Sequence, residues 1–353
     1  MLNFNGIPDP DPESAIWLGK LYALYGAIGI PANLIVLLLT LTSEKLRAIP
    51  MNICILSITF ADLMVLVAFL SSTFWAMSFD PMICKVMGVG IYIFDVMTLL
   101  LPACLAVCRY VAICSEQTLH PRLRVLKKRK GIIILNGIFW AYGLTFTIPL
   151  IITDRFGLGD IGICGVTDIN SIGLWIYYMV VVVGALFGAY VVMFIFYRRL
   201  GNWVKTTSSM MVMSSRTRET LNGTRNLMRM LRWLLFLPMV VYYPALTIEA
   251  LLRIVPRAVS TRTARYFLIT VPLAHVLDPI ATIIFVKSYR TALLKSFGRP
   301  RKIGFQSSPA DPGTIQSAAA ASPIFEIKKT LKTPTYGNSL KPSEHHLPGQ
   351  MAH

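Results

Sequence analysis

The stretch Leu21–Ser43, LYALYGAIGIPANLIVLLLTLTS, carries no charged residue. About 20 mostly apolar residues are enough for a helix to cross the roughly 30 Å of hydrocarbon in a bilayer. Lipid offers the backbone no hydrogen-bond partners, so a stretch of this kind crosses as a helix. Leu21–Ser43 therefore predicts a transmembrane helix close to the start of the chain.

Six further stretches share this apolar character, and each holds at most one acidic residue and no Lys or Arg. None alternates apolar and polar residues as the strands of a membrane barrel do. The sequence therefore predicts an all-α membrane protein with a bundle of seven transmembrane helices. The six further spans are Ala48–Phe79, Val86–Val107, Gly131–Thr153, Ile169–Tyr197, Trp233–Leu252 and Tyr266–Val286.

The composition excludes several other classes of protein. Of the 353 residues, 55% are hydrophobic and 14% are charged, whereas about 25% of the residues in a soluble domain are charged. The mean hydropathy is +0.60, and a soluble fold this apolar would expose patches that aggregate. Six Cys residues are too few for a disulfide scaffold, and the chain is too apolar to be disordered throughout.

The basic residues indicate the orientation of the chain. With the N-terminus outside, seven of the 34 Lys and Arg residues lie in outer segments and the other 27 in inner loops and the tail. An excess of positive charge marks the cytoplasmic side of membrane proteins. The first 16 residues contain no Lys or Arg, so they do not resemble a cleavable signal peptide.

The membrane domain is expected to cover residues 17–298, between an extracellular N-terminus (1–16) and a disordered cytoplasmic tail (299–353) rich in Ser, Thr, Pro and Lys. In Lys287–Phe297, apolar residues alternate with basic ones at helical spacing. This pattern predicts a short amphipathic eighth helix on the inner leaflet.

Polar residues inside the predicted spans indicate a shared polar core. A buried charge is costly in a membrane and usually functional. If the helix faces converge, the core could hold water, a proton or Na⁺, because two neighbouring carboxylates do not both ionise without a cation or a shared proton. The alternative is a set of separate residues, each hydrogen-bonded to backbone or water. The core candidates are Asn33, Asp62, Thr98, His275 and Asp278.

Two cysteines fall in predicted outer segments, where the compartment is oxidising. A disulfide between Cys84 and Cys164 would tie the second outer loop to the third span. The other four cysteines are expected to be packing residues rather than zinc ligands, because no Cys or His partners stand at metal spacing. No metal site or cofactor is predicted, apart from the possible Na⁺. These four are Cys54, Cys104, Cys108 and Cys114.

These features together resemble the rhodopsin-like (class A) G-protein-coupled receptors, from about Gly26 to Phe297. Asn33, the Ala61-Asp62-Leu63 run and Trp140 match single-helix signatures, and Cys84 stands 25 residues before Arg109. Cys108-Arg109-Tyr110 is similar to the family's Asp-Arg-Tyr motif, and Phe236-Leu237-Pro238 is similar to its Trp-x-Pro motif. Asp278-Pro279, followed by Thr282, is similar to Asn/Asp-Pro-x-x-Tyr.

The resemblance implies a receptor that transmits binding of an extracellular ligand to a heterotrimeric G protein, with an arrestin-like regulator at the tail and lipids around it. It implies no enzyme activity, and the sequence holds no H-E-x-x-H, G-x-S-x-G or P-loop motif. The alternative is a transporter or channel that uses the Asp62/Asp278 core. The residues implied for coupling and switching are Arg109, Tyr110, Tyr197, Phe236, Pro238, Asp278 and Pro279.

The ligand is left open by the sequence. Pro272 occupies the position of the retinal lysine and Ile91 that of the amine-binding Asp, which argues against both ligand types. Four arginines in the last outer loop, Arg265 among them, raise the possibility of a peptide or an acidic small molecule. The pocket candidates are Ile91, Asp95, Tyr242, Glu249 and Arg265.

Several positions depart from the family motifs. Cys108 and Arg218 replace acids that often restrain the signature Arg, and Phe236 and Thr282 replace a Trp and a Tyr. The lost acids predict high signalling without ligand.

Overall fold

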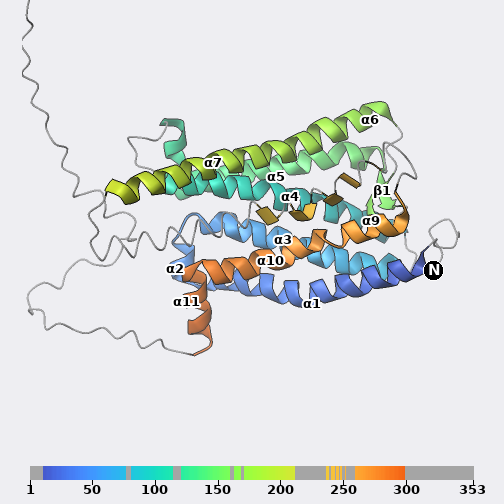
Figure 1. Cartoon of the computed structure of the whole chain (residues 1–353), viewed down its shortest axis with the longest axis horizontal. Helices are drawn as coiled ribbons and strands as arrows, with labels where there is room; N and C mark the ends of the chain where they lie inside the picture. The colour runs from blue at the N-terminus through green and yellow to red at the C-terminus, as the bar shows by residue number, and fades with distance from the viewer. Residues whose placement is uncertain are drawn as a thin grey trace, which may run out of the picture. The chain divides into compact units, whose positions relative to one another are not determined.

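The structure, a computed structural model, describes residues 11–76, 81–113, 121–159, 163–167, 171–210 and 259–298, together with 236–237, 240–242, 244–245, 247–248 and 251. Helices dominate this part of the chain (Figure 1). The helices are α1 (Pro12–Thr42), α2 (Glu44–Arg47), α3 (Asn52–Ala76), α4 (Pro81–Ile113), α5 (Arg129–Ile152), α6 (Ile172–Tyr177), α7 (Gly184–Met210), α9 (Thr261–Leu268), α10 (Val271–Phe285) and α11 (Lys287–Ser296). A 3₁₀ helix, η1 (Pro121–Lys127), precedes α5, and a π-helical segment, η2 (Tyr178–Val183), joins α6 to α7.

Five helical stretches of the described chain are long and apolar enough to cross a membrane. They match the first four predicted spans and the last one, where α9 and α10 follow each other closely. The predicted span Ile169–Tyr197 falls on α6, η2 and α7. Half of the predicted span Trp233–Leu252 lies outside the described residues, and those of its residues that are described are helical.

The helices extend beyond the spans that hydropathy marks. α1 begins at Pro12, inside the predicted N-terminal segment, because Asp11 caps the helix by accepting a hydrogen bond from the Ser14 backbone N–H at 3.3 Å. α7 continues past Tyr197 to Met210. Hydropathy locates the hydrocarbon boundary, whereas the backbone hydrogen bonds of a helix continue into water.

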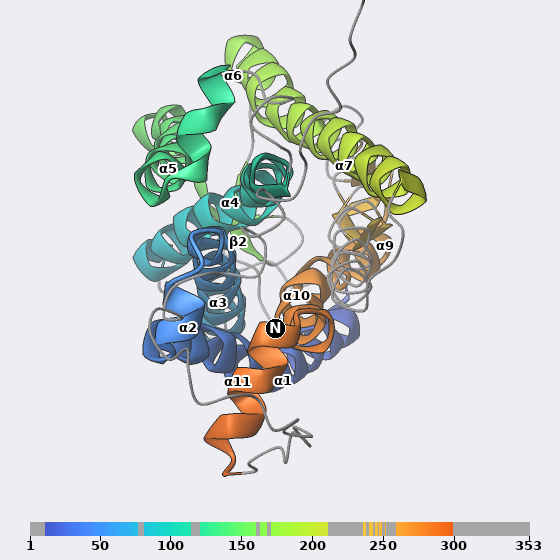
Figure 2. The same cartoon turned by 90° about the vertical axis from the view of Figure 1, so that its left-hand side faces the viewer.

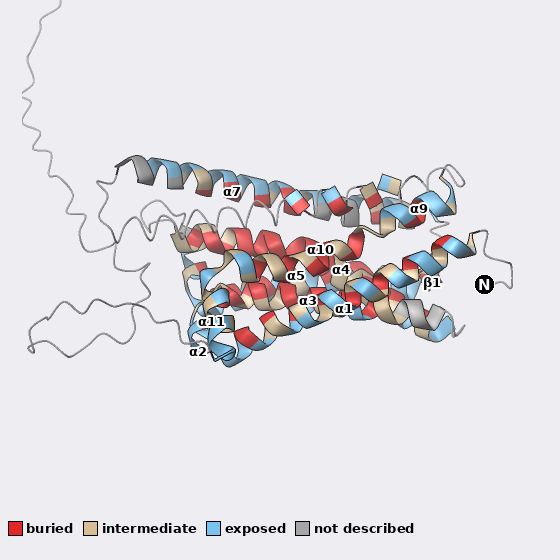
Figure 3. Cartoon of the chain, turned by 60° about the horizontal axis from the view of Figure 1, so that its bottom comes forward, coloured by how far each residue is buried: buried red, intermediate tan, exposed pale blue. Residues whose placement is uncertain are grey.

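α4 lies at the centre of the bundle. It packs against α3, α5 and α7, and α1 packs against α3 and α10 (Figure 2). In the most apolar window of α4, 72% of the residues are buried, against 33% in α1 and in α5. Large apolar side chains such as Leu38, Ile134 and Phe187 are exposed instead on outward faces (Figure 3). Such faces suit lipid, because they would aggregate in water.

α11 turns away from the end of α10, as Figure 1 shows. Its Tyr289 is completely buried, and the Tyr289 and Thr40 hydroxyl oxygens are 2.9 Å apart. Burial raises the pKa of Tyr289 to about 12, so the phenol keeps its proton at physiological pH. Lys287, Arg290 and Lys295 are exposed. The predicted amphipathic eighth helix is therefore confirmed, whereas the tail from residue 299 lies outside the described residues.

Candidate functional site

The centre of the bundle holds a buried network around His275 of α10. The imidazole Nδ1 is 2.9 Å from Oδ1 of Asp62 on α3, and its Nε2 is 3.2 Å from Oδ1 of Asp95 on α4. His275 is 0% exposed, the Asp62 side chain 1% and the Asp95 side chain 26%. A neutral imidazole has one N–H and can donate to only one of the two carboxylates. Two ionised carboxylates are therefore best satisfied by an imidazolium.

Tyr242 completes this network from the partly described segment 236–251. Its hydroxyl donates to Oδ1 of Asp95 at 3.0 Å and also forms a hydrogen bond with Nε2 of His275. Tyr242 is 2% exposed. Three helices and this segment thus meet at one set of polar side chains, which supports the shared core that the sequence predicts.

Asn33 and Thr98 border the network without contacting its carboxylates. The Asn33 amide donates to the backbone carbonyls of Gly29 and His275, each at 3.0 Å, and so joins α1 to α10. The Thr98 hydroxyl donates to the Asp95 carbonyl at 2.8 Å. The Asn33 side-chain oxygen accepts no hydrogen bond from the described residues. Asn33 therefore links two helices through its amide nitrogen and keeps a buried oxygen acceptor.

Asp278 is buried and lines a small cavity together with Asp62 of the network. Two acidic residues and two threonines thus line the cavity among apolar residues. The remaining lining residues are Ile55, Ile58, Thr59, Leu105, Pro279 and Thr282.

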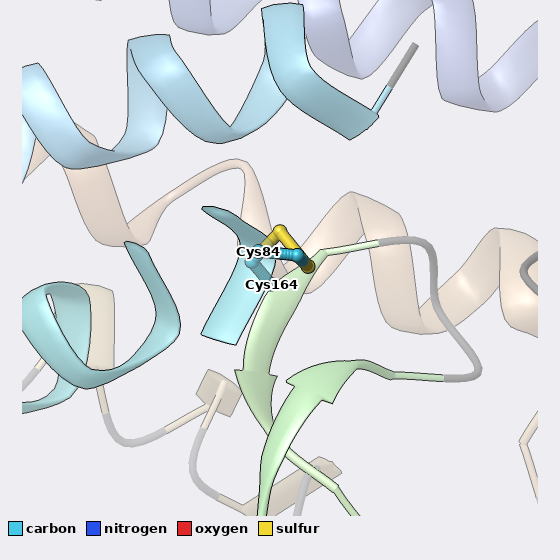
Figure 4. The surroundings of a disulfide bond; sticks show 2 residues. All are labelled: Cys84 and Cys164. Atoms are coloured by element: carbon cyan, nitrogen blue, oxygen red, sulfur yellow. A yellow bond between two sulfur atoms is a disulfide. The ribbon is translucent and has the colours of Figure 1, made fainter. Parts of the chain in front are cut away.

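A β-hairpin covers one end of α4. β1 (Phe156–Leu158) pairs antiparallel with β2 (Cys164–Val166). A disulfide joins Cys164 to Cys84 of α4, which confirms the predicted pair (Figure 4). Gly88 of α4 allows the close approach, because a Cβ there would lie 2.9 Å from the backbone N of Gly165. The hairpin therefore rests directly on the α4 backbone.

The opposite end of α4 carries Arg109. This arginine is 3% exposed, and it interacts electrostatically with Tyr197 of α7 and Tyr289 of α11. Tyr110 beside it packs edge-on against Phe196, with ring centroids 5.3 Å apart. The predicted switch residues Arg109, Tyr110 and Tyr197 therefore lie together at this end of the bundle.

Phe236, which the resemblance assigns to the switch, has a side chain that is 62% exposed, whereas Tyr242 is 2% exposed and contacts the buried network. Tyr242 stands two residues before Pro244, the same spacing that separates Phe236 from Pro238. The aromatic-x-Pro motif that faces inward is therefore the second one. Pro238 lies outside the described residues.

Arg265 is a structural residue rather than an open cation at the rim. It is 2% exposed, and its Nη1 donates to the Asp11 carbonyl at 2.7 Å and to the Ser14 hydroxyl at 2.9 Å. Arg262 lies 3.2 Å from the Asp11 carboxylate. Both arginines therefore hold the start of α1 against α9. Of the other pocket candidates, Ile91 is buried and Glu249 lies outside the described residues.

Two features of the structure were not predicted from the sequence: the burial of Tyr289 in α11 and a cluster of three cysteines between α3 and α4. Tyr289 could have been singled out as an aromatic residue on the apolar side of the predicted eighth helix. Cys54, Cys104 and Cys108 meet at the interface between α3 and α4. The four-residue spacing of Cys104 and Cys108 was visible in the sequence, but their contact with Cys54 of another helix was not.

Comparisons with known proteins agree with this geometry. Residues 32–281 match the family model "7 transmembrane receptor (rhodopsin family)". The fold is similar to the crystal structure of squid rhodopsin, with a TM-score of 0.63 and 17% sequence identity over 83% of this chain and 87% of that chain. A comparison with curated protein sequences found no match. Nothing in these findings supports the transporter alternative. The chain belongs to the rhodopsin family of seven-transmembrane receptors.

Proposed function

We propose that the protein is a G-protein-coupled receptor of the plasma membrane, with its N-terminus outside the cell. An extracellular ligand would shift an equilibrium between two arrangements of the helices, to the extent that it binds one of them better. Membership of the rhodopsin family supports signalling by the chain. The 27 basic residues of the predicted inner segments, against seven in the outer ones, support the orientation.

The observation that carries this proposal is the buried network of His275, Asp62, Asp95 and Tyr242. It joins three helices and the 236–251 segment through side chains that are buried except for Asp95. A ligand group that donates a hydrogen bond or a positive charge to Asp95 would compete with Tyr242 and His275. The ligand would thereby release the 236–251 segment from α4 and α10.

The intracellular consequence would appear at Arg109. Its guanidinium is buried and interacts electrostatically with Tyr197 of α7 and Tyr289 of α11, so displacement of these helices would uncover a buried positive charge. A G-protein α-subunit would bind to the surface that opens there. Binding of ligand and of G protein would then favour the same arrangement, and each would increase the affinity for the other.

We further propose that His275 supplies the positive charge that a sodium ion would otherwise bring to Asp62. The imidazole contacts two carboxylates, and a second cation beside it would be repelled. Ligand affinity should therefore not change when NaCl is replaced by choline chloride at equal ionic strength. A sodium-dependent change that Asp62→Asn removes would contradict this assignment.

A ligand screen read out by G-protein dissociation in cells tests the proposed function. A mixed library of peptides and small molecules is applied to cells that express the full chain, Arg109→Ala or Arg124→Ala. Arg124 is exposed on η1 and is the matched control. Responses should occur with the full chain and the control, and should be absent in Arg109→Ala at equal surface expression. An undiminished response in Arg109→Ala would refute coupling through this residue.

A further inference from the structure

Three buried cysteines form a cluster between α3 and α4. The Sγ atom of Cys54 lies 3.8 Å from that of Cys104 and 3.9 Å from that of Cys108. All three sulfur atoms lie within 4.8 Å of one another, and each residue is 0% exposed. Cys104 and Cys108 are four residues apart, so they project from the same face of α4 toward Cys54.

The spacing of the sulfur atoms matches that of thiolates around one metal ion. A metal–sulfur bond of about 2.3 Å places neighbouring sulfur atoms about 3.8 Å apart in tetrahedral geometry and about 4.0 Å apart in trigonal geometry. The Cys54–Cys104 and Cys54–Cys108 distances fall in this interval. Two of the three sulfur pairs therefore already have the spacing of ligands to one metal ion.

The surroundings of the cluster favour a soft cation of low charge. Thiolates select soft ions such as Cu(I), Zn²⁺ and iron–sulfur clusters. Structural zinc takes four ligands, and within the described residues no fourth Cys, His, Asp or Glu belongs to the group. Cu(I) is satisfied by three sulfur ligands in a plane.

The positive charge of Arg109, the residue after Cys108, interacts with Cys54. This charge would offset part of the negative charge that three thiolates and one Cu(I) carry together.

We propose that Cys54, Cys104 and Cys108 form a three-sulfur binding site for Cu(I). The ion would replace thiol protons, with no change in the oxidation state of copper or sulfur. The site would fix α3 to α4 one residue from Arg109. It is independent of the proposed G-protein coupling, because metal binding is measured on the purified protein without ligand or G protein.

The test uses the full chain, purified in detergent under anaerobic conditions with ascorbate, which keeps copper as Cu(I) and leaves the Cys84–Cys164 disulfide intact. It is titrated with Cu(I) in competition with the chelator bicinchoninate, and bound metal is counted by mass spectrometry. One Cu(I) per chain is expected, with X-ray absorption showing three sulfur neighbours at about 2.3 Å. Cys54→Ser, Cys104→Ser and Cys108→Ser should each weaken binding roughly 100-fold or more, because each removes a direct ligand.

The matched control is Met97→Leu, which removes another fully buried sulfur of α4 outside the cluster at nearly constant volume. It should bind copper as the unaltered chain does. Circular dichroism and the Cys84–Cys164 disulfide report whether each variant is folded, and a second series with Ala in place of Ser replaces any variant that is not. Absence of Cu(I) binding, equal binding by the cysteine variants, or tighter binding of Zn²⁺ would overturn the proposal.

Discussion

Asp62→Asn should destabilise the protein strongly, because it removes one partner of a buried charged pair. Asp62 and His275 are 1% and 0% exposed and 2.9 Å apart. Breaking such a pair costs about 3–5 kcal/mol, since the remaining charge is left buried and uncompensated. The Asp95 carboxylate, 3.2 Å from the other ring nitrogen, still holds the imidazole. We therefore expect a loss near the lower limit, about 3 kcal/mol.

A double-mutant cycle isolates the pair. Asp62→Asn, His275→Asn and the double variant are unfolded at equilibrium in mixed detergent micelles and followed by tryptophan fluorescence. Once Asp62 is lost, removing His275 breaks only its contacts with Asp95 and Tyr242, so a coupling energy of about 2–3 kcal/mol is expected for the Asp62–His275 pair. The control pair is Lys85–Asp154, whose atoms are 2.8 Å apart but whose side chains are 40% and 72% exposed.

The control pair should show a coupling of about 1 kcal/mol or less, because water and salt screen exposed charges. The two pairs have nearly the same separation, so the difference between their coupling energies measures the effect of burial. If the effects of Asp62→Asn and His275→Asn add to within about 0.5 kcal/mol, the two residues are uncoupled. Additivity would refute the buried ion pair and the mechanism built on it.

Three further substitutions test the hairpin end of the bundle. Gly88→Ala should displace the hairpin and lower the unfolding temperature, whereas Gly90→Ala, whose Cβ would meet nothing within 4 Å, should be neutral. Arg265→Ala removes two hydrogen bonds that a buried charged group donates to the start of α1 and should cost about 1–3 kcal/mol. Arg262→Ala, which breaks an ion pair of a 56% exposed side chain, should cost less than about 1 kcal/mol in the same unfolding assay. Cys164→Ser opens a cross-link across 80 residues, and chain entropy predicts a loss of about 4.5 kcal/mol, visible as reduced surface expression.

The sequence predicted the helices well because membrane insertion imposes a local rule. Each apolar run had to be long enough to span hydrocarbon, and this can be read without knowing its neighbours. Asp62 and His275 were likewise identified as core residues because a polar side chain in such a run is costly. A polar side chain in such a run faces the inside of the bundle rather than lipid, and this explains why the predicted core positions of Asp62 and His275 agree with the structure.

The misplaced residues depend on distant partners. Phe236 and Tyr242 both precede a Pro by two residues, and the helix face that turns inward decides between them. Arg265 was predicted to face a ligand because its partner Asp11 lies 254 residues away in the chain. Cys54 meets Cys104 and Cys108 only after α3 packs against α4. Contacts between helices could thus not be predicted from the sequence of each helix alone.

The link between Arg265 and Asp11 has a consequence for biosynthesis. The first helix inserts early, but Arg265, whose side chain holds the first turn of that helix, is synthesised only after 253 intervening residues have been added. Until then, that turn depends on the Asp11 cap alone. A ribosome-bound chain halted before residue 261 should therefore leave a cysteine introduced at Ala15 open to labelling by an impermeant maleimide, and release of the finished chain should protect it.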